Sequence, residues 1–290
     1  MDIGLFAMNI NTCADPAVAV ELAQAAESAG FNSLWTGEHV VLPATRTEQS
    51  PFPATAPLLD AVIGATLLAT ATTTIRIGTG IIVLPLRNPV VLAKELASLD
   101  VISGGRLMPG FGVGYLDVEF DAVGVPMAER GQRMDEYIEA LIALWTMDTP
   151  TFEGRHVSFS GIDAHPRPAQ KPTPPIVIGG GSEAAVRRAW RRGHVFYAFG
   201  VTKEWIPAYR EAEAAIAADS ERPAHLGPLQ LYITPVDGHT PDDLRHYEEA
   251  GVDGVVLMPG TVDPNERHRA VPRAEIMATI DTTAAGYINA

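Results

Sequence analysis

The sequence predicts a parallel (β/α)8 barrel, an α/β fold in which eight buried strands alternate with helices. Short apolar runs alternate with helical patterns along the whole chain. The 290 residues match the size of one such barrel and contain no domain-sized linker, so we expect a single domain over residues 1–290. Apolar residues make up 47% of the chain and aromatic ones 7%, which suits an aliphatic core around a buried parallel sheet. A doubly wound sheet would show the same alternation, but eight units favour the barrel.

The first half of the chain supplies four β/α units. Asp15-Pro16 predicts the start of the first helix, because Asp caps free N–H groups and Pro suits the first helical position. Gly30 suits the end of that helix. Pro109 inside the fourth strand is unusual, since a central strand rarely tolerates a missing N–H donor. The predicted strands cover residues 3–8, 32–36, 75–84 and 106–113, and the predicted helices cover residues 17–29, 58–72, 89–103 and 131–147.

The second half repeats the pattern after a small hairpin predicted over residues 152–159. A Pro-rich passage over residues 165–175 leads into the fifth strand, and the pattern at the C-terminus is helical but weak. The predicted strands cover residues 176–178, 195–199, 229–234 and 254–258, and the predicted helices cover residues 182–192, 203–218 and 242–250.

Composition excludes several classes of function. The formal net charge of −14 repels a phosphate backbone, so we expect no nucleic acid partner. Cys13 is the only cysteine, which excludes an intrachain disulfide and a cysteine-based zinc site. The eight His residues show no H-E-x-x-H spacing, and we expect no metal. We see no signal peptide and no apolar run of membrane length, so we expect a cytoplasmic protein that does not contact a membrane.

A histidine follows the second predicted strand, where barrel enzymes carry their chemistry. The stretch Trp35-Thr36-Gly37-Glu38-His39 places an imidazole there, and His can donate or accept a proton near neutral pH. The alternative for His39 is a loop histidine that bonds to the backbone.

Glycines mark the ends of the third and fourth predicted strands. Gly78 and Gly80 indicate either a bulge with close approach of a ligand, or space for a neighbouring side chain. Gly112 and Gly114 do not fit the G-x-G-x-x-G spacing of a dinucleotide fold, but they can form a bare backbone wall under a flat ring system.

Three consecutive glycines end the fifth predicted strand directly before a helix. Such a run exposes amide N–H groups to an anion, and the helix dipole assists. The alternative is a tight turn with an ordinary helix cap. The residues concerned are Gly179, Gly180, Gly181 and Ser182.

Four stretches together resemble the bacterial luciferase-like superfamily, in particular its members that depend on the deazaflavin coenzyme F420. The most specific is residues 75–107 (IRIGTGIIVLPLRNPVVLAKELASLDVISGGRL). The resemblance runs from residue 3 to about residue 199. The other stretches are residues 35–43 (WTGEHVVLP), the pair 112–115 (GVGY) and 129–145 (ERGQRMDEYIEALIALW), and residues 174–189 (PPIVIGGGSEAAVRRA).

The resemblance implies a (β/α)8 barrel with insertions and a defined cofactor site. His39 matches the histidine that faces the reactive ring. A non-prolyl cis peptide is implied between Gly80 and Ile81, where it forms a bulge behind the central ring. The cofactor phosphate site maps onto Gly179, Gly180, Gly181 and Ser182.

The sequence departs from the family pattern at three places. Tyr115 stands where some deazaflavin-dependent sugar-phosphate dehydrogenases carry Glu, which argues against their acid role and substrate. Pro109 replaces an apolar strand residue. Relatives often read G-D-G after the fifth helix, whereas this chain reads Arg192-Gly193-His194.

The resemblance therefore implies an oxidoreductase that transfers a hydride between coenzyme F420 and a small organic substrate. We expect His39 to exchange a proton with the substrate, Glu38 to orient His39, and the loop over residues 42–57 to act as a lid. The alternatives are an FMN-dependent monooxygenase of the same superfamily and a barrel that binds a ligand without catalysis. Because such barrels often form dimers, a homodimer is also expected.

Overall fold

The computed structural model describes residues 1–259 and 269–290. Ten short parallel strands form one curled sheet, and a separate antiparallel hairpin consists of β7 (Phe152–Glu153) and β8 (Ser158–Phe159). The strands of the large sheet are β1 (Asp2–Leu5), β2 (Ser33–Thr36), β3 (Arg76–Thr79), β4 (Ile82–Val83), β5 (Leu107–Met108), β6 (Gly110–Gly112), β9 (Val177–Gly179), β10 (Val195–Val201), β11 (Gln230–Pro235) and β12 (Gly254–Leu257).

The large sheet closes on itself. Its order is β4-β6-β9-β10-β11-β12-β1-β2-β3-β5. The two ends of this order meet, because β3 and β4 are consecutive halves of the third predicted strand, and β5 and β6 are halves of the fourth. β3 pairs with β5, and β4 pairs with β6. Eight strand positions therefore form a ring, so the predicted barrel is confirmed and the doubly wound sheet is excluded.

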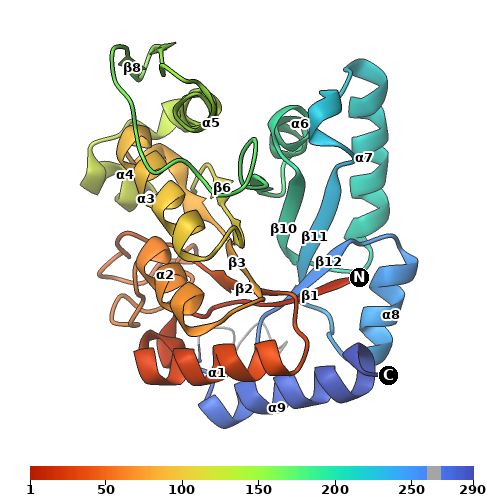
Figure 1. The fold of residues 1–290 in the computed structure, drawn as a ribbon. Coiled ribbons are helices and arrows are strands. Elements are labelled where there is room, and N and C mark those ends of the chain that lie inside the picture. The colour runs from red at the N-terminus through yellow and green to blue at the C-terminus, as the bar shows by residue number, and fades with distance from the viewer. Residues whose placement is uncertain (260–268) are drawn as a thin grey trace.

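Helices surround this ring (Figure 1). α1 and α9 lie side by side along one edge of the barrel, so the first and last helices cover neighbouring strands. The helices are α1 (Pro16–Ser28), α2 (Ala61–Ala71), α3 (Pro89–Ile102), α4 (Asp117–Val123), α5 (Arg130–Thr146), α6 (Glu183–Arg192), α7 (Trp205–Asp219), α8 (Pro241–Glu249) and α9 (Arg273–Thr283).

Caps set the helix starts. The Asp15 side chain accepts hydrogen bonds from the N–H groups of Ala17 and Val18, as the Asp-Pro pair predicts. α2 begins three residues later than the predicted residue 58. The reason is that Asp60 is the cap, while Leu58 forms an antiparallel bridge with Ile10. None of the helices in the described part of the chain is long and apolar enough to cross a bilayer.

The third and fourth predicted strands are each interrupted. The cis peptide bond that the family resemblance implied between Gly80 and Ile81 is present, and it separates β3 from β4. Pro109 separates β5 from β6. Beside this break, the Thr79 hydroxyl makes two hydrogen bonds to the main chain of Gly110. It accepts from the N–H of Gly110 at 2.7 Å and donates to the carbonyl of Gly110 at 2.9 Å. Pro109 has no N–H to donate, but its carbonyl still accepts a hydrogen bond from the N–H of Val177 in β9 at 2.9 Å.

The inside of the barrel is more aromatic than composition predicts. Trp35 and Tyr197 stack with ring centroids 5.3 Å apart, and Tyr232 packs against the same indole. Gly78 supplies space for this cluster, since an ideal Cβ there would lie 2.5 Å from Trp35. Of the two interpretations of Gly78, space for a neighbouring side chain is therefore the observed one. Aliphatic side chains dominate the larger core between sheet and helices.

Candidate active site

The structure brings the predicted site segments together at one mouth of the barrel. β2 pairs with β3 up to Thr36 and Thr79, and the N–H of Gly80 donates to the carbonyl of Thr36 at 2.7 Å. β4 pairs with β6, and β6 pairs with β9. The segments that hold His39, Ile81, Gly112 and Gly179 therefore leave four neighbouring strand positions at the same carboxyl-terminal end, where barrel enzymes place their chemistry.

His39 lies between two polar side chains at this mouth. Its Nδ1 atom is 3.2 Å from Oε2 of Glu119, and its Nε2 atom is 3.5 Å from the hydroxyl of Tyr115. The rings of Phe52 and Tyr115 contact the imidazole edge to face. Only 12% of the His39 side chain is exposed. His39 is therefore held by side chains, not by a backbone bond as the alternative had it.

Glu38 does not orient His39, which corrects our expectation. Its carboxylate accepts a hydrogen bond from the N–H of Val83 at 2.6 Å and contacts the guanidinium of Arg87. The carboxylate that reaches the imidazole comes from elsewhere in the chain. It belongs to Glu119, 80 residues along the chain.

A buried charge network surrounds Glu38. Arg87 also bonds to Asp60 at 2.5 Å, so one guanidinium joins the loop after β2 to the cap of α2. Burial raises the pKa of Glu38 despite the nearby Arg87. Burial is the largest single influence on the pKa of Asp60 and raises it. The hydrogen bonds from Arg87 and from the N–H groups of Ile63 and Val62, together with the charge of Arg87, outweigh burial and lower that pKa. The network holds the loop that carries His39 against the third strand.

Two of the predicted cofactor glycines make room for a side chain of the protein. An ideal Cβ on Gly112 would lie 2.6 Å from Cδ1 of Ile81, and one on Gly179 would lie 2.6 Å from its Cγ2. Gly114 has a φ of +77°, and a Cβ there would meet Val83 at 2.5 Å. These glycines shape the floor of the mouth around Ile81. A backbone wall of Gly112 and Gly114 under a flat ring stays a prediction.

The fifth-strand glycines lie at the start of α6, and Ser182 caps that helix with its hydroxyl accepting from the N–H of Ala185 at 3.3 Å. The N–H of Gly180 donates to the carbonyl of Tyr197, so this amide is used within the sheet. Gly181 differs from its neighbours, because a Cβ there would meet nothing within 4 Å and its φ is not positive. Neither packing nor a positive φ therefore requires glycine at Gly181.

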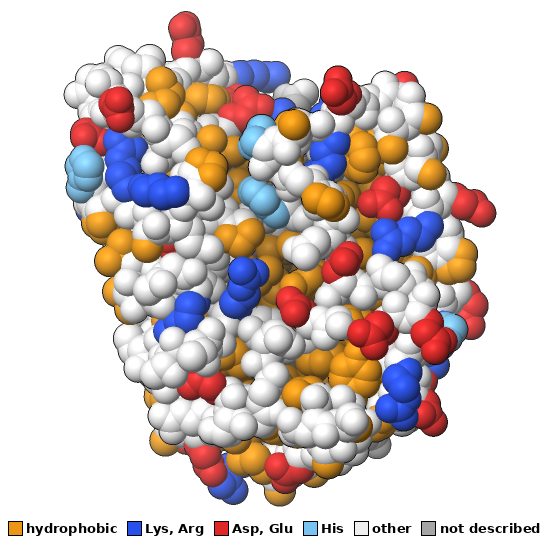
Figure 2. Space-filling view, turned by 45° about the vertical axis from the view of Figure 1, so that its right-hand side comes forward, with side chains coloured by type: hydrophobic (Ala, Val, Ile, Leu, Met, Phe, Trp, Pro, Cys, Tyr) orange, Lys and Arg blue, Asp and Glu red, His pale blue; other side chains and the backbone are white. Residues whose placement is uncertain are grey.

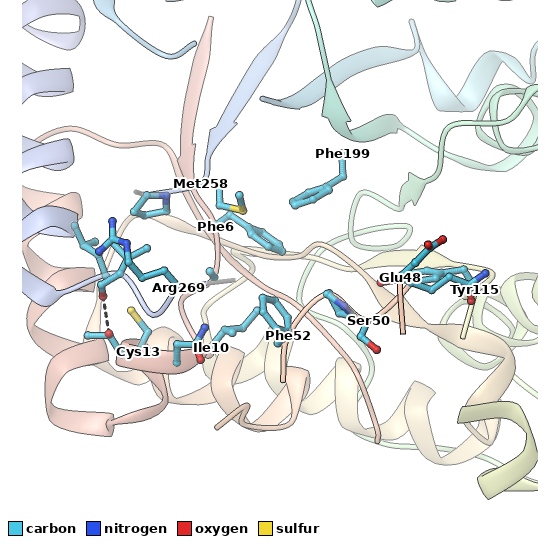
Figure 3. A pocket seen from close by; sticks show the side chains of 18 residues that line it. Phe6, Ile10, Cys13, Glu48, Ser50, Phe52, Tyr115, Phe199, Met258 and Arg269 are labelled. Carbon is cyan, nitrogen blue, oxygen red and sulfur yellow. Dashed lines mark hydrogen bonds between the residues drawn. The ribbon is translucent and has the colours of Figure 1, made fainter. Parts of the chain in front are cut away.

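A cavity of about 290 Å³ opens at the same mouth. Figure 3 shows Phe6, Phe52, Phe199 and Met258 around its centre. They come from three strand ends and from the loop predicted to act as a lid. On the face in Figure 2, apolar side chains are visible in a central hollow, and charged side chains lie around it. The cavity therefore suits an apolar ligand, at the small end of the usual range for ligand pockets.

We searched the described residues for a group of side chains that could bind a metal ion. Within residues 1–259 and 269–290, no group of three or more His, Cys, Asp or Glu side chains is arranged to hold a metal ion.

A family model described as luciferase-like monooxygenase matches residues 1–285. The chain belongs to this family. The family that the sequence motifs resemble is therefore confirmed. Its members are oxidoreductases and monooxygenases.

Two individual relatives of this luciferase-like chain share roughly a third of their aligned residues with it. It is 28% identical over 257 residues to the uncharacterized protein Rv0940c of Mycobacterium tuberculosis, which covers 85% of this chain and 87% of the relative. It is 35% identical over 161 residues to the oxygenase component of the flavin-dependent trigonelline monooxygenase of Acinetobacter baylyi. That match covers 55% of this chain and 41% of the relative.

Solved structures of a monooxygenase and of an F420-dependent dehydrogenase share the fold. The monooxygenase RslO1 from Streptomyces bottropensis superposes with a TM-score of 0.75 at 22% identity, over 100% of this chain and 99% of that one. An F420-dependent secondary alcohol dehydrogenase in complex with an F420-acetone adduct superposes with a TM-score of 0.76 at 17% identity, over 99% and 98%. At these identities the likeness shows the fold alone.

Sequence reasoning missed the helix that carries Glu119. α4 has seven residues and no side-chain cap, so the usual start signal is absent. Leu116 and Phe120 are both buried, and their spacing of four residues was the available signal for a helix in this luciferase-like chain.

The third departure from the family pattern, His194, lies before β10 at the opposite end of the barrel, where its Nδ1 accepts from the N–H of Ile176.

Proposed function

We propose that the chain is an oxidoreductase that transfers a hydride between coenzyme F420 and a small organic substrate. The observation that carries the proposal is the His39–Glu119 pair beside an apolar cavity at the barrel mouth. Hydride transfer to a carbonyl carbon requires a proton on the oxygen, and the reverse reaction removes one. An imidazole that is nearly buried and contacts a carboxylate suits this task.

The residues at the mouth fit a deazaflavin in two respects. Gly181 leaves open space beside exposed amides at the start of α6, which suits a phosphate tail. The half-buried Ile81, after the cis peptide, leaves the floor of the mouth apolar, which suits a flat ring. When bound, F420 would supply the hydride carrier. The protein would bind the ring and the substrate, exclude water with Phe6, Phe52 and Phe199, and exchange the proton at His39.

An FMN-dependent monooxygenase is the second candidate. The specific observation in its favour is the 35% identity to the oxygenase component of a flavin-dependent monooxygenase. The same apolar mouth would accept either ring. What favours F420 is the proton-exchanging pair, because a hydride reaction on a carbonyl or alcohol needs such a group at the substrate oxygen.

Anaerobic turnover tests the proposal. Purified protein is mixed with F420 and a panel of small alcohols, or with reduced F420 and the matching carbonyl compounds, and the absorbance of the oxidised coenzyme is followed. We expect turnover without oxygen and a loss of roughly 10²-fold or more in His39→Asn. Turnover that needs oxygen and reduced FMN would instead establish the monooxygenase. Binding of either cofactor without turnover over the whole panel would favour a binding barrel.

A further inference from the structure

We infer that Glu119 is a positioning residue that keeps the proton of neutral His39 on Nδ1, so that Nε2 is the atom that exchanges a proton with the substrate. The inference rests on the proposed function for the role of His39. The choice between the two nitrogens rests on the geometry around Glu119 alone.

The two oxygens of Glu119 have separate partners. Oε1 accepts from the N–H of Val40 at 2.7 Å, and Oε2 faces Nδ1 of His39 at 3.2 Å. A backbone N–H can only donate, and carboxylate oxygens accept, so Oε1 is committed to Val40. Oε2 then accepts from Nδ1, which must carry the proton. Glu119 is fully buried, so water does not compete for either oxygen.

The other nitrogen of His39 faces Tyr115, a residue of the cavity wall. Nε2 lies 3.5 Å from the hydroxyl of Tyr115, and Tyr115 lines the cavity (Figure 3). With the proton on Nδ1, Nε2 holds the lone pair. It can accept a proton from a substrate hydroxyl as the hydride leaves the carbon, and it can return that proton to a carbonyl oxygen in the reverse reaction.

The ring orientation is fixed by these partners. Turning the imidazole by half a rotation would place carbon atoms against Oε2 and against the Tyr115 hydroxyl, and both polar contacts would be lost. The edge-to-face contacts with Phe52 and Tyr115 hold the plane of the ring.

The variant Glu119→Gln reverses the polarity of this arrangement without changing its shape. The N–H of Val40 still needs an oxygen, so the amide oxygen stays there and the NH₂ group must face Nδ1. That group donates, so Nδ1 becomes the acceptor and the proton moves to Nε2. In a Ser-His-Asp triad, the same exchange of carboxylate for amide leaves the wrong tautomer and lowers kcat by about 10⁴-fold.

The test compares Glu119→Gln with Asp121→Asn, which removes an exposed carboxylate from the same helix and serves as the matched control. Each protein is labelled with ¹⁵N-histidine, and two-bond ¹H–¹⁵N correlations are recorded without cofactor at about pH 8.5, two units above the ordinary pKa of His. His39→Asn assigns the His39 signals by their loss. Denaturant unfolding of each variant shows that it folds.

We expect a protonated Nδ1 in the wild type and in Asp121→Asn, and a protonated Nε2 in Glu119→Gln. We also expect kcat/KM to fall roughly 10²–10⁴-fold in Glu119→Gln alone. A merely structural Glu119 would leave the tautomer unchanged, because Gln still accepts from Val40. An unchanged tautomer in Glu119→Gln, or a protonated Nε2 in the wild type, overturns the inference. If no hydride turnover is found, the proposed function fails while the spectra still decide the tautomer.

Discussion

The carboxylate of Glu38 accepts a hydrogen bond from the N–H of Val83 at 2.6 Å, and this contact ties the loop that carries His39 to the strand that follows Ile81. Arg87 contacts the same carboxylate and continues to Asp60. Three segments at the barrel mouth therefore meet at one buried acid. Its role is to hold the proton-exchanging side chain and the floor of the mouth in one relative position.

Removal of this acid should destabilise the protein. Glu38→Ala leaves the N–H of Val83 without its acceptor and the partly buried Arg87 with Asp60 as its remaining carboxylate partner, and we expect the free energy of unfolding to fall by about 3–5 kcal/mol. Glu38→Gln keeps one acceptor, so a loss of about 1–3 kcal/mol is expected. Urea denaturation measures both, with the exposed Asp148→Asn as control. Equal stability of Glu38→Ala and the control would show that the network does not hold the mouth together.

Glu27 provides a pH-dependent contribution to stability. Partial burial raises its pKa, but hydrogen bonds from the N–H groups of Thr74, Ile75 and Thr73 outweigh this and lower the pKa to about 2. Since the folded pKa is depressed, the contribution is present above the unfolded pKa and is lost as pH falls towards 2. Glu27→Gln should therefore be less stable than the wild type by about 1–2 kcal/mol at pH 7, and the difference should shrink at pH 3. A difference that stays the same at both pH values would contradict this account of Glu27.

Two glycines of the barrel should respond oppositely to a methyl group. A Cβ on Gly110 would lie 1.9 Å from the carbonyl oxygen of Thr79, so backbone must move and the closing pair of strands is disturbed. We expect Gly110→Ala to lose about 3 kcal/mol or more in unfolding free energy. Gly181→Ala meets open space and should unfold like the wild type. Thermal melts of the two variants decide this, and similar melts would refute the close contact at Gly110.

Tyr115 should matter less than His39. Tyr115→Phe removes the hydroxyl 3.5 Å from Nε2 but keeps the ring against the imidazole. Because 48% of Tyr115 is exposed, water can replace that hydroxyl. We expect kcat/KM to fall less than about tenfold, against roughly 10²-fold or more for His39→Asn. Steady-state kinetics of both variants give the comparison, and a reversed order would make Tyr115 the proton-exchanging group.

The barrel and the position of His39 follow from local patterns in the sequence. Strand, helix and cap signals repeat along the chain, and a histidine after a strand end is visible without the structure. The partner of His39 is not visible in this way, because Glu119 is 80 residues away on a helix without a cap. Nothing local distinguishes Glu38 from Glu119 as the acid that reaches the imidazole.

The glycines show a second limit of sequence reasoning. A glycine pattern states that a side chain is missing but not what fills its place. Gly78 admits Trp35, and Gly112 and Gly179 admit Ile81, so three glycines of the strand ends serve packing inside the barrel. Only the three-dimensional neighbours single out Gly181, whose open surroundings leave room for a ligand.

Equilibrium binding of F420 and FMN tests the central claim most directly. Each cofactor is titrated with the purified protein while quenching of the cofactor's fluorescence is followed, and Gly181→Ala is measured in parallel. We predict that F420 binds at least about tenfold more tightly than FMN, a difference of 1.4 kcal/mol. We also predict that Gly181→Ala weakens F420 binding without changing the unfolding transition. Tight binding of FMN with no binding of F420 would contradict the account.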